Sequence, residues 1–182
     1  KGRRPDSVEI TTIDKDVERR DLTINALMYD LDTREVVDYV GGIQDIENQT
    51  IRAVTSDEEG DAPGRRFEED RLRTLRAIRF AARMGSDIEP ETKEAIIAHN
   101  DLSLDPDMSD DRITGEFIKG LTSAQDAVHY INLLLEVGLL SQVFPGLDVR
   151  HTAAVTSNNV PVQLAFLLGN NDVERLGTVL KK

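Results

Sequence analysis

Cysteine and tryptophan are absent from this 182-residue chain, and aromatic residues make up only 4% of it. Without cysteine there is no disulfide and no thiolate chemistry, and the three histidines lack the spacing of a zinc site. No apolar run approaches the roughly 20 residues that a membrane helix needs, and residues 1–5 lack the apolar core of a signal peptide. We therefore expect a soluble, cytoplasmic, helix-rich protein with no membrane partner.

Positive charge is scarce overall but concentrated in one segment. The formal net charge of −12 argues against a nucleic-acid partner, because affinity for phosphates depends on lysine and arginine. Residues 65–83, however, contain seven arginines against three acidic residues, a local net charge of +4. The acidic runs at 56–61 and 105–111 lie outside this segment and are typical of solvated loops. We expect a polyanionic nucleotide or RNA to bind at residues 65–83.

The first part of the chain has the pattern of a small α/β unit. Alternating apolar and polar residues, rich in β-branched types, predict strands at 8–13 and 35–40. Residues 21–29 are ambiguous by pattern and can begin as a capped helix. The unit is then completed by a glycine turn, a short segment and a closing segment, at residues 41–42, 43–48 and 50–54.

The rest of the chain is predicted to be helical, which gives an α+β fold. Residues 55–64 are the clearest linker, because they are acidic and contain two glycines and a proline. Apolar residues from Phe67 to Ala82 recur at helical spacing and form one stripe. Further helices are predicted at residues 89–100, 110–121, 123–137 with Ser123 as cap, and 160–168.

Asp70 and Arg73 form a candidate pair for reading a nucleotide base. On a helix they share one face with Ala77, whose small side chain leaves room for a flat ligand. A carboxylate accepts hydrogen bonds and a guanidinium donates them, so the pair matches a base edge with a donor beside an acceptor. Cytosine and adenine present that edge, whereas guanine and uracil present the reverse. We expect selection of C and A, because mismatched polar groups are left unsatisfied.

Arg76 and Arg79 continue the same ridge of this helix. Guanidinium groups bind phosphate through charge-assisted hydrogen bonds, so both are expected to hold the triphosphate of the same nucleotide. The segment also fits a simpler interpretation, an amphipathic helix with ion pairs from Glu69 and Asp70 to Arg73. The pattern of this segment by itself leaves both interpretations open.

Three longer motifs occur in order along the chain. They are Arg19-Arg20-Asp21-Leu22-Thr23-Ile24-Asn25-Ala26-Leu27, Val37-Asp38-Tyr39-Val40-Gly41-Gly42-Ile43-Gln44-Asp45-Ile46 and Phe67-Glu68-Glu69-Asp70-Arg71-Leu72-Arg73. In order and spacing they resemble the class II tRNA nucleotidyltransferase and bacterial poly(A) polymerase family, and the resemblance runs from residue 2 to about 147. It implies a head with the metal site, a helical neck that selects the nucleotide, and a helical body that holds tRNA.

The resemblance also implies a division into domains and a role for each site residue. The segments would be the C-terminal part of the nucleotidyltransferase head at 1–54, the linker at 55–64, the neck at 65–121 and the start of the body at 122–182. Arg20, Asp21 and Asn25 would lie near the ribose and phosphates of the incoming nucleotide. The base would be read by Asp70 and Arg73, and the phosphates held by Arg76 and Arg79.

The metal site of the family has no counterpart in this sequence. Its Gly-Gly-x-Val-Arg-Asp loop and its Asp-x-Asp pair bind the triphosphate and two Mg²⁺ ions. The Asp-x-Asp spacing occurs in Asp30-Leu31-Asp32 and in Asp105-Pro106-Asp107, but neither lies where the family has its metal-binding pair. We expect surface turns at both places. We therefore expect no catalytic or metal-binding residue in this chain and no transfer activity from it alone. For the intact enzyme, the resemblance implies Mg²⁺ as cofactor and ATP, CTP and a tRNA or other RNA 3′ end as partners.

The leading hypothesis is a fragment of a tRNA nucleotidyltransferase, which adds CMP and AMP from CTP and ATP to the 3′ end of tRNA. A poly(A) polymerase fragment is an alternative that the sequence does not separate from it. A truncated, non-catalytic module that binds RNA or nucleotides is a second alternative, and an acidic helical interaction protein is a third. The first residue is lysine rather than methionine, which fits a fragment.

Overall fold

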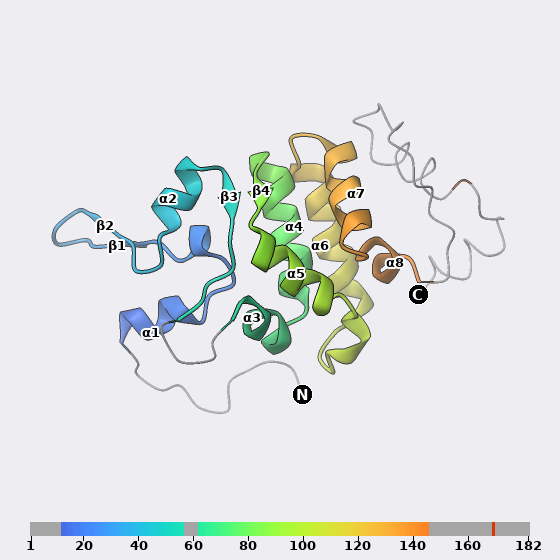
Figure 1. The fold of residues 1–182 in the computed structure, drawn as a ribbon, viewed down its shortest axis with the longest axis horizontal. Helices are drawn as coiled ribbons and strands as arrows, with labels where there is room; N and C mark the ends of the chain where they lie inside the picture. Colours follow the sequence, from blue (N-terminus) through green and yellow to red (C-terminus); the bar gives the residue numbers. More distant parts are fainter. Residues whose placement is uncertain (1–11, 57–61, 146–168, 170–182) are drawn as a thin grey trace.

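The computed structural model describes residues 12–56, 62–145 and 169, and it shows an α/β part beside a helical part (Figure 1). The α/β part contains, in order, α1 (Ile13–Glu18), the 3-10 helix η1 (Thr23–Asn25), β1 (Met28–Tyr29), β2 (Val36–Val37), α2 (Gly42–Glu47) and β3 (Thr50–Ile51). The helical part contains α3 (Pro63–Glu69), α4 (Leu72–Met84), β4 (Asp87–Ile88), α5 (Pro90–Ala98), η2 (Leu102–Leu104), α6 (Asp110–Ser123), α7 (Ala127–Glu136) and α8 (Leu140–Val143). The predicted α+β class is confirmed.

Two short strand pairs shape the α/β part and attach it to the helices. β1 and β2 form an antiparallel hairpin with Met28 opposite Val37, so the strand predicted at 35–40 shortens to two residues. β3 pairs in parallel with β4, and Ile51 lies opposite Ile88. This second pair joins a segment before the predicted linker to a segment after it.

The beginning of the described chain differs from the sequence prediction. Ile13 begins α1 instead of ending a strand. The acidic residues Asp14 and Asp16 lie in the first turn of that helix, where they interact favourably with its dipole. Residues 8–11 of the predicted strand lie outside the described part. The ambiguous segment 21–29 contains η1 and then β1 rather than a continuous helix.

The arginine-rich segment is two helices rather than one. α3 ends at Glu69, and Asp70 has an extended backbone with φ −153° and ψ 101°. The side chain of Asp70 accepts a hydrogen bond from the Leu72 N–H at 3.1 Å and thereby caps the start of α4. Aspartate favours such caps because its carboxylate replaces a missing backbone acceptor. The prediction that Asp70 and Arg73 lie on one continuous helix face is therefore wrong.

The later helices agree with the sequence except at one cap. α5 and α6 confirm the helices predicted at 89–100 and 110–121, and Pro90 occupies the first turn as expected. Ser123 ends α6 instead of capping the next helix. α7 is capped by Asp126, whose side chain accepts from the Val128 N–H at 2.8 Å. The helix predicted at 160–168 lies outside the described residues.

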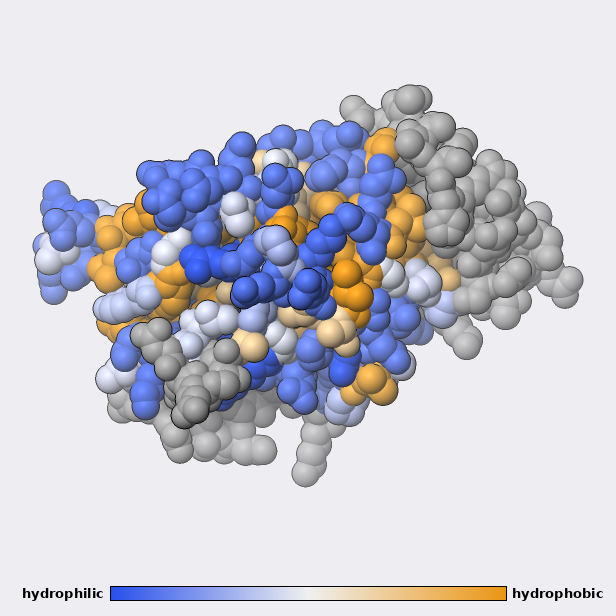
Figure 2. Space-filling view, in the orientation of Figure 1, coloured by the Kyte–Doolittle hydropathy of each residue, from blue (hydrophilic) through white to orange (hydrophobic). Residues whose placement is uncertain are grey.

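One hydrophobic core extends through both parts, with α4 packed against α6 and α7 near its centre. Leu22 and Ile51 of the α/β part are fully buried in the same cluster as Leu75 of α4 and Tyr130 of α7. The main core therefore crosses the linker predicted at 55–64, and a smaller cluster of Val17, Ala26 and Val54 lies within the α/β part. Figure 2 shows that the face seen in the orientation of Figure 1 is mainly hydrophilic, with apolar patches over both the α/β part and the helical part.

The Gly41–Gly42 turn packs α2 tightly against η1. Gly41 has a positive φ of 80°, which glycine adopts without strain. A Cβ on Gly42 would collide with the backbone carbonyl of Thr23, so only glycine permits this approach. Asp45 of α2 accepts a hydrogen bond from the Thr23 hydroxyl at 2.5 Å and thereby anchors η1.

Asp38 holds the turn from the other side. Its carboxylate accepts backbone hydrogen bonds from four successive residues, Val40, Gly41, Gly42 and Ile43, at 2.8–3.1 Å. Partial burial alone would raise the pKa of Asp38, but the four N–H donors outweigh it and hold the pKa below its ordinary value. The ionised form is therefore the one that stabilises the turn.

Arg79 lies inside the helical core rather than on its surface. Its side chain is 10% exposed, forms an ion pair with Glu116 of α6, and stacks over the Phe80 ring at 4.1 Å. Glu116 is 4% exposed, so this pair joins α4 to α6 away from solvent. This buried position of Arg79 does not agree with the predicted phosphate-binding role. That prediction assumed that Arg76 and Arg79 face the same way on the helix.

We predict that Asp38→Asn lowers the free energy of unfolding at pH 7 by about 1 kcal/mol, as for a lost helix cap. The folded-state pKa of Asp38 is lowered, so its contribution is present above the unfolded value of about 3.9 and is lost as the pH falls through the folded value. Urea unfolding between pH 3 and 7 should show a smaller loss of stability on acidification for the variant. Asp32→Asn, at an exposed position in the hairpin loop, is the control and should match the wild type.

We predict that Arg79→Ala lowers the free energy of unfolding by about 3 to 5 kcal/mol, because it leaves the Glu116 carboxylate buried without its main partner. Arg83→Ala removes an exposed arginine from the same helix and should change stability by no more than about 0.5 kcal/mol. Urea unfolding at pH 7 measures both. Equal stability of the two variants would contradict the buried pair.

Candidate functional site

A cleft of about 430 Å³ gathers most of the predicted site residues. Its lining residues are Arg19, Arg20, Asp21, Asn25, Asp70, Leu72, Arg73, Arg76 and Arg112. Six of the seven residues singled out in the sequence are among them, and Arg79 is not. The cleft thus unites the segment before η1 with the start of α4, two motifs that are about 50 residues apart in the sequence.

The wall on the α/β side is built by residues 19–25. Leu22 is fully buried and forms a β-bridge with Ala53, which fixes the backbone of this segment in the core. The carboxylate of Asp21 accepts hydrogen bonds from the Leu22 N–H at 3.1 Å and from the Asn25 amide at 3.3 Å. A capped turn therefore presents Asp21 and Asn25 to the cleft.

An ion pair between Asp21 and Arg76 closes the cleft floor. Arg76 Nε donates to Asp21 Oδ2 at 2.6 Å, and the two side chains are 37% and 8% exposed. Burial alone would raise the pKa of Asp21, but the hydrogen bond and charge of Arg76 outweigh it and lower that pKa. Burial would lower the pKa of Arg76, whereas Asp21 raises it above its ordinary value. The pair is therefore charged, and it ties the α/β part to α4.

Arg20 lies over the same turn. Its guanidinium donates to the backbone carbonyl of Asn25 at 3.0 Å and to Asp16 of α1 at 3.2 Å. The side chain is still 40% exposed. Arg20 thus has a structural ion pair and a face that lines the cleft.

Asp70 and Arg73 both line the cleft, although they do not share a helix face. Arg73 is 21% exposed and donates to Glu69 Oε2 at 2.9 Å and to the backbone carbonyl of Arg19 at 3.2 Å. Asp70 contacts Arg112 of α6 through both carboxylate oxygens at 3.2 Å. Ala77, which was expected to leave room for the ligand, is fully buried in the core instead.

Three cleft residues were not among the predicted site residues: Arg19 and Leu72, which lie within the sequence motifs, and Arg112, which lies outside them. Arg112 lies 42 residues after Asp70, in the first turn of α6, and no local motif marks it. The one sequence feature that could have pointed to it is its place directly after the acidic pair Asp110 and Asp111. Only the packing of α6 against α4 brings it to the cleft.

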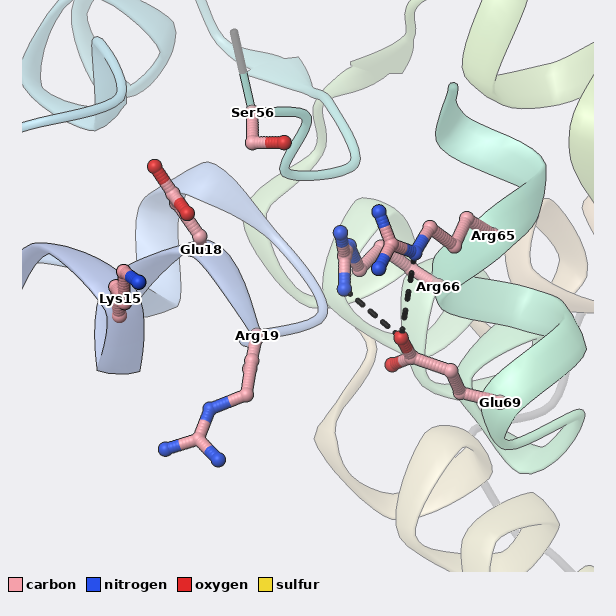
Figure 3. Close-up of a pocket in the computed structure, with 7 residues that line it drawn as sticks. All are labelled: Lys15, Glu18, Arg19, Ser56, Arg65, Arg66 and Glu69. Atoms are coloured by element: carbon pink, nitrogen blue, oxygen red, sulfur yellow. Dashed lines mark hydrogen bonds and ion pairs between the residues drawn. The ribbon is translucent and has the colours of Figure 1, made fainter. Parts of the chain in front are cut away.

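A second cavity of about 250 Å³ adjoins the first through Arg19. Figure 3 shows its lining residues, which are Lys15, Glu18, Arg19, Ser56, Arg65, Arg66 and Glu69. Dashed lines in Figure 3 join Glu69 to Arg65 and Arg66, at 3.9 and 3.0 Å. The other oxygen of Glu69 accepts from Arg73, so a carboxylate that lines this cavity holds an arginine that lines the cleft.

The charge of the first cleft suits an anion. Its lining contains five arginines and two aspartates, a formal balance of +3 in a chain of −12. Clustered arginines attract polyanions and bind phosphate oxygens through paired N–H groups. Within residues 12–56 and 62–145, no group of three or more His, Asp or Glu side chains is arranged to hold a metal ion. None of the helices in that part has the length and apolar composition of a membrane span.

Comparison with known protein sequences identifies related enzymes. Residues 1–52 match the family model of the poly A polymerase head domain, and residues 85–150 match that of the probable RNA and SrmB-binding site of polymerase A. A CCA-adding enzyme of Bacillus velezensis is 41% identical over 162 residues, which are 87% of this chain and 38% of that enzyme. A CCA-adding enzyme of Bacillus subtilis is 36% identical over 160 residues, with the same coverage. The chain therefore spans about two fifths of the length of these relatives.

Comparison with solved structures agrees with the sequence comparison. The Bacillus stearothermophilus CCA-adding enzyme in complex with CTP superposes with a TM-score of 0.73 at 28% identity, over 95% of this chain and 44% of that one. A tRNA nucleotidyltransferase complexed with a primer tRNA and an incoming ATP analog has a TM-score of 0.75 at 24% identity, over 98% and 56%, and shows the shared fold. The sequence motifs, the cleft that unites them and these matches together establish that the chain belongs to the family of tRNA nucleotidyltransferases and poly(A) polymerases.

Proposed function

We propose that this chain supplies the nucleotide-selecting cleft of a CCA-adding tRNA nucleotidyltransferase, which transfers CMP and AMP from CTP and ATP to a tRNA 3′ end. The observation that carries the proposal is the cleft itself, because it unites Asp70 and Arg73 with Arg20, Asp21, Asn25 and Arg76. The similarity to CCA-adding enzymes over 87% of the chain supports it.

In this proposal, the base lies against Asp70 and Arg73. The Asp70 carboxylate accepts a hydrogen bond from the exocyclic amino group, and the Arg73 guanidinium donates to the adjacent ring nitrogen. Cytosine and adenine satisfy both groups, whereas guanine and uracil leave a donor facing a donor and an acceptor facing an acceptor. The side chains of the protein thus replace a nucleic-acid template.

The sugar and phosphates lie toward the α/β side of the cleft. Arg20, Asp21 and Asn25 border the ribose and phosphates, and Arg76 points a guanidinium fixed by Asp21 into the same space. A fixed guanidinium loses less entropy when it binds phosphate than a free one does. Arg79 has no part in this proposal, because Glu116 holds it in the core.

Transfer itself needs groups beyond those described. Mg²⁺ in such enzymes stabilises the charge that develops on the phosphoryl oxygens. The described residues do not form a site for it, so this proposal contains no step that passes through the metal. Mg²⁺ dependence stays a prediction that derives from the family resemblance, and a cytoplasmic location stays a prediction from the composition of the chain.

Poly(A) polymerase is the second candidate function. The match of residues 1–52 to a family model of the poly A polymerase head domain is the observation that favours it. CTP binding separates the two candidates, because a poly(A) polymerase uses ATP alone.

We predict that the chain binds ATP and CTP at least about thirtyfold more tightly than GTP and UTP in calorimetric titrations, since each of the two mismatched polar groups costs roughly 1 to 3 kcal/mol. Arg73→Ala should erase this preference, because it removes the donor that faces the ring nitrogen. Arg83→Ala removes an exposed arginine of the same helix that does not line the cleft, and it should keep the preference.

Equal affinities for the four nucleotides in a folded preparation would contradict base reading by Asp70 and Arg73. Binding of ATP without CTP would instead favour the poly(A) polymerase candidate. The absence of any nucleotide binding would contradict the proposed function as a whole.

A further inference from the structure

Arg112 is the only cation from α6 among the lining residues of the cleft in the described part of the chain. Its Nη2 lies 3.2 Å from Oδ1 and 3.2 Å from Oδ2 of Asp70. The Arg112 and Asp70 side chains are 30% and 15% exposed, so the contact is partly shielded from solvent. A guanidinium that bridges both oxygens restrains rotation of the carboxylate about its last bond.

Arg112 is itself held at both ends. Its backbone N–H donates to the Ser109 carbonyl at 3.0 Å, which begins α6, and to the Ser109 hydroxyl at 3.3 Å. Its Nη1 donates to the backbone carbonyl of Asp107 at 3.2 Å. The segment between η2 and α6 therefore holds the Arg112 guanidinium in place, and the side chain does not move freely.

The same segment holds the backbone next to Asp70. Asp105, which was expected in a surface turn, is buried, and its Oδ2 accepts from the Arg71 N–H at 3.2 Å. Asp70 and Arg71 lie between α3 and α4, so neither helix alone determines where the Asp70 carboxylate points. The segment before α6 supplies the missing constraint on both backbone and side chain.

We propose that Arg112 is a positioning residue for base selection, which orients the Asp70 carboxylate so that its acceptor edge faces the exocyclic amino group of C or A. This inference rests on the proposed function. Without Arg112, the Leu72 N–H still holds Oδ1 of Asp70, but the carboxylate loses its contact with α6 and moves more freely. A carboxylate turned away from the base neither accepts from the amino group of C or A nor opposes the carbonyl of G or U, so the discrimination falls. Affinity due to the phosphates depends on other arginines and stays.

The test compares the affinities of the four nucleoside triphosphates by calorimetry at pH 7. Arg112→Ala should reduce two affinity ratios, ATP over GTP and CTP over UTP, by roughly tenfold each. A tenfold change corresponds to the loss of about one polar contact. Arg112→Lys, which keeps the charge but lacks the second nitrogen that donates to the Asp107 carbonyl, should restore part of the ratio. Lys119→Ala, an exposed residue of α6 outside the cleft, is the matched control and should leave the ratios unchanged.

A purely structural role would give a different result. It would weaken all four affinities by the same factor or lower the folded fraction, which circular dichroism and urea unfolding measure on the same samples. If Arg112→Ala does not fold, Arg112→Gln, which keeps N–H donors, replaces it. In the Asp70→Ala background, a second change at Arg112 should leave the ratios unaltered, because the residue on which it acts is gone.

The outcomes separate the inference from the proposed function. If the wild-type chain shows no preference for ATP and CTP, both the proposed function and this inference fail. If the wild type has the preference and the folded Arg112 variants keep it, only the positioning role fails. If substitution of Arg112 changes the affinity ratios by the same factor in the wild-type and the Asp70→Ala backgrounds, Arg112 does not act through Asp70, and the inference is overturned.

Discussion

The ion pair between Asp21 and Arg76 is the contact on which the cleft depends, because it joins the turn of the α/β part to α4 across the floor of the site. Asp21 is buried, and the favourable charge of Arg76 offsets the cost of that burial, so loss of Arg76 would leave a buried carboxylate without its cation. Leu22 and Ile51, in the same core as α4, keep the two parts together around this pair. The site is therefore a product of the shared core rather than of a linker between independent domains.

Around this pair, three arginines of α4 lie in three different environments. Arg79 stabilises the core through Glu116, Arg76 is fixed at the floor by Asp21, and Arg73 lies at the cleft wall with Glu69. One helix thus contributes to the core on one face and to the cleft lining on another. The division follows from burial, since Arg79 is 10% exposed beside Glu116 whereas Arg76 stays 37% exposed beside Asp21.

The break between α3 and α4 places the Asp70 carboxylate in the cleft lining. Asp70 leaves the helical conformation, caps α4 and turns its carboxylate toward α6, where Arg112 contacts it. A continuous helix would have held Asp70 beside Arg73 with no partner from α6. A site assembled from two helix ends and a third helix depends on packing at each joint, and small displacements there alter which hydrogen bonds a base can make.

The sequence by itself determined the α+β class, the helices α5 and α6, the family resemblance and the identity of the residues in the cleft other than Arg19, Leu72 and Arg112. These follow from periodicity, capping residues and motif order, which are local properties. Only the tertiary structure decided that Asp70 lies at a helix break, that Arg79 is sealed by Glu116, and that Arg112 reaches the cleft. The last two depend on contacts between residues 37 and 42 positions apart, which no local pattern encodes.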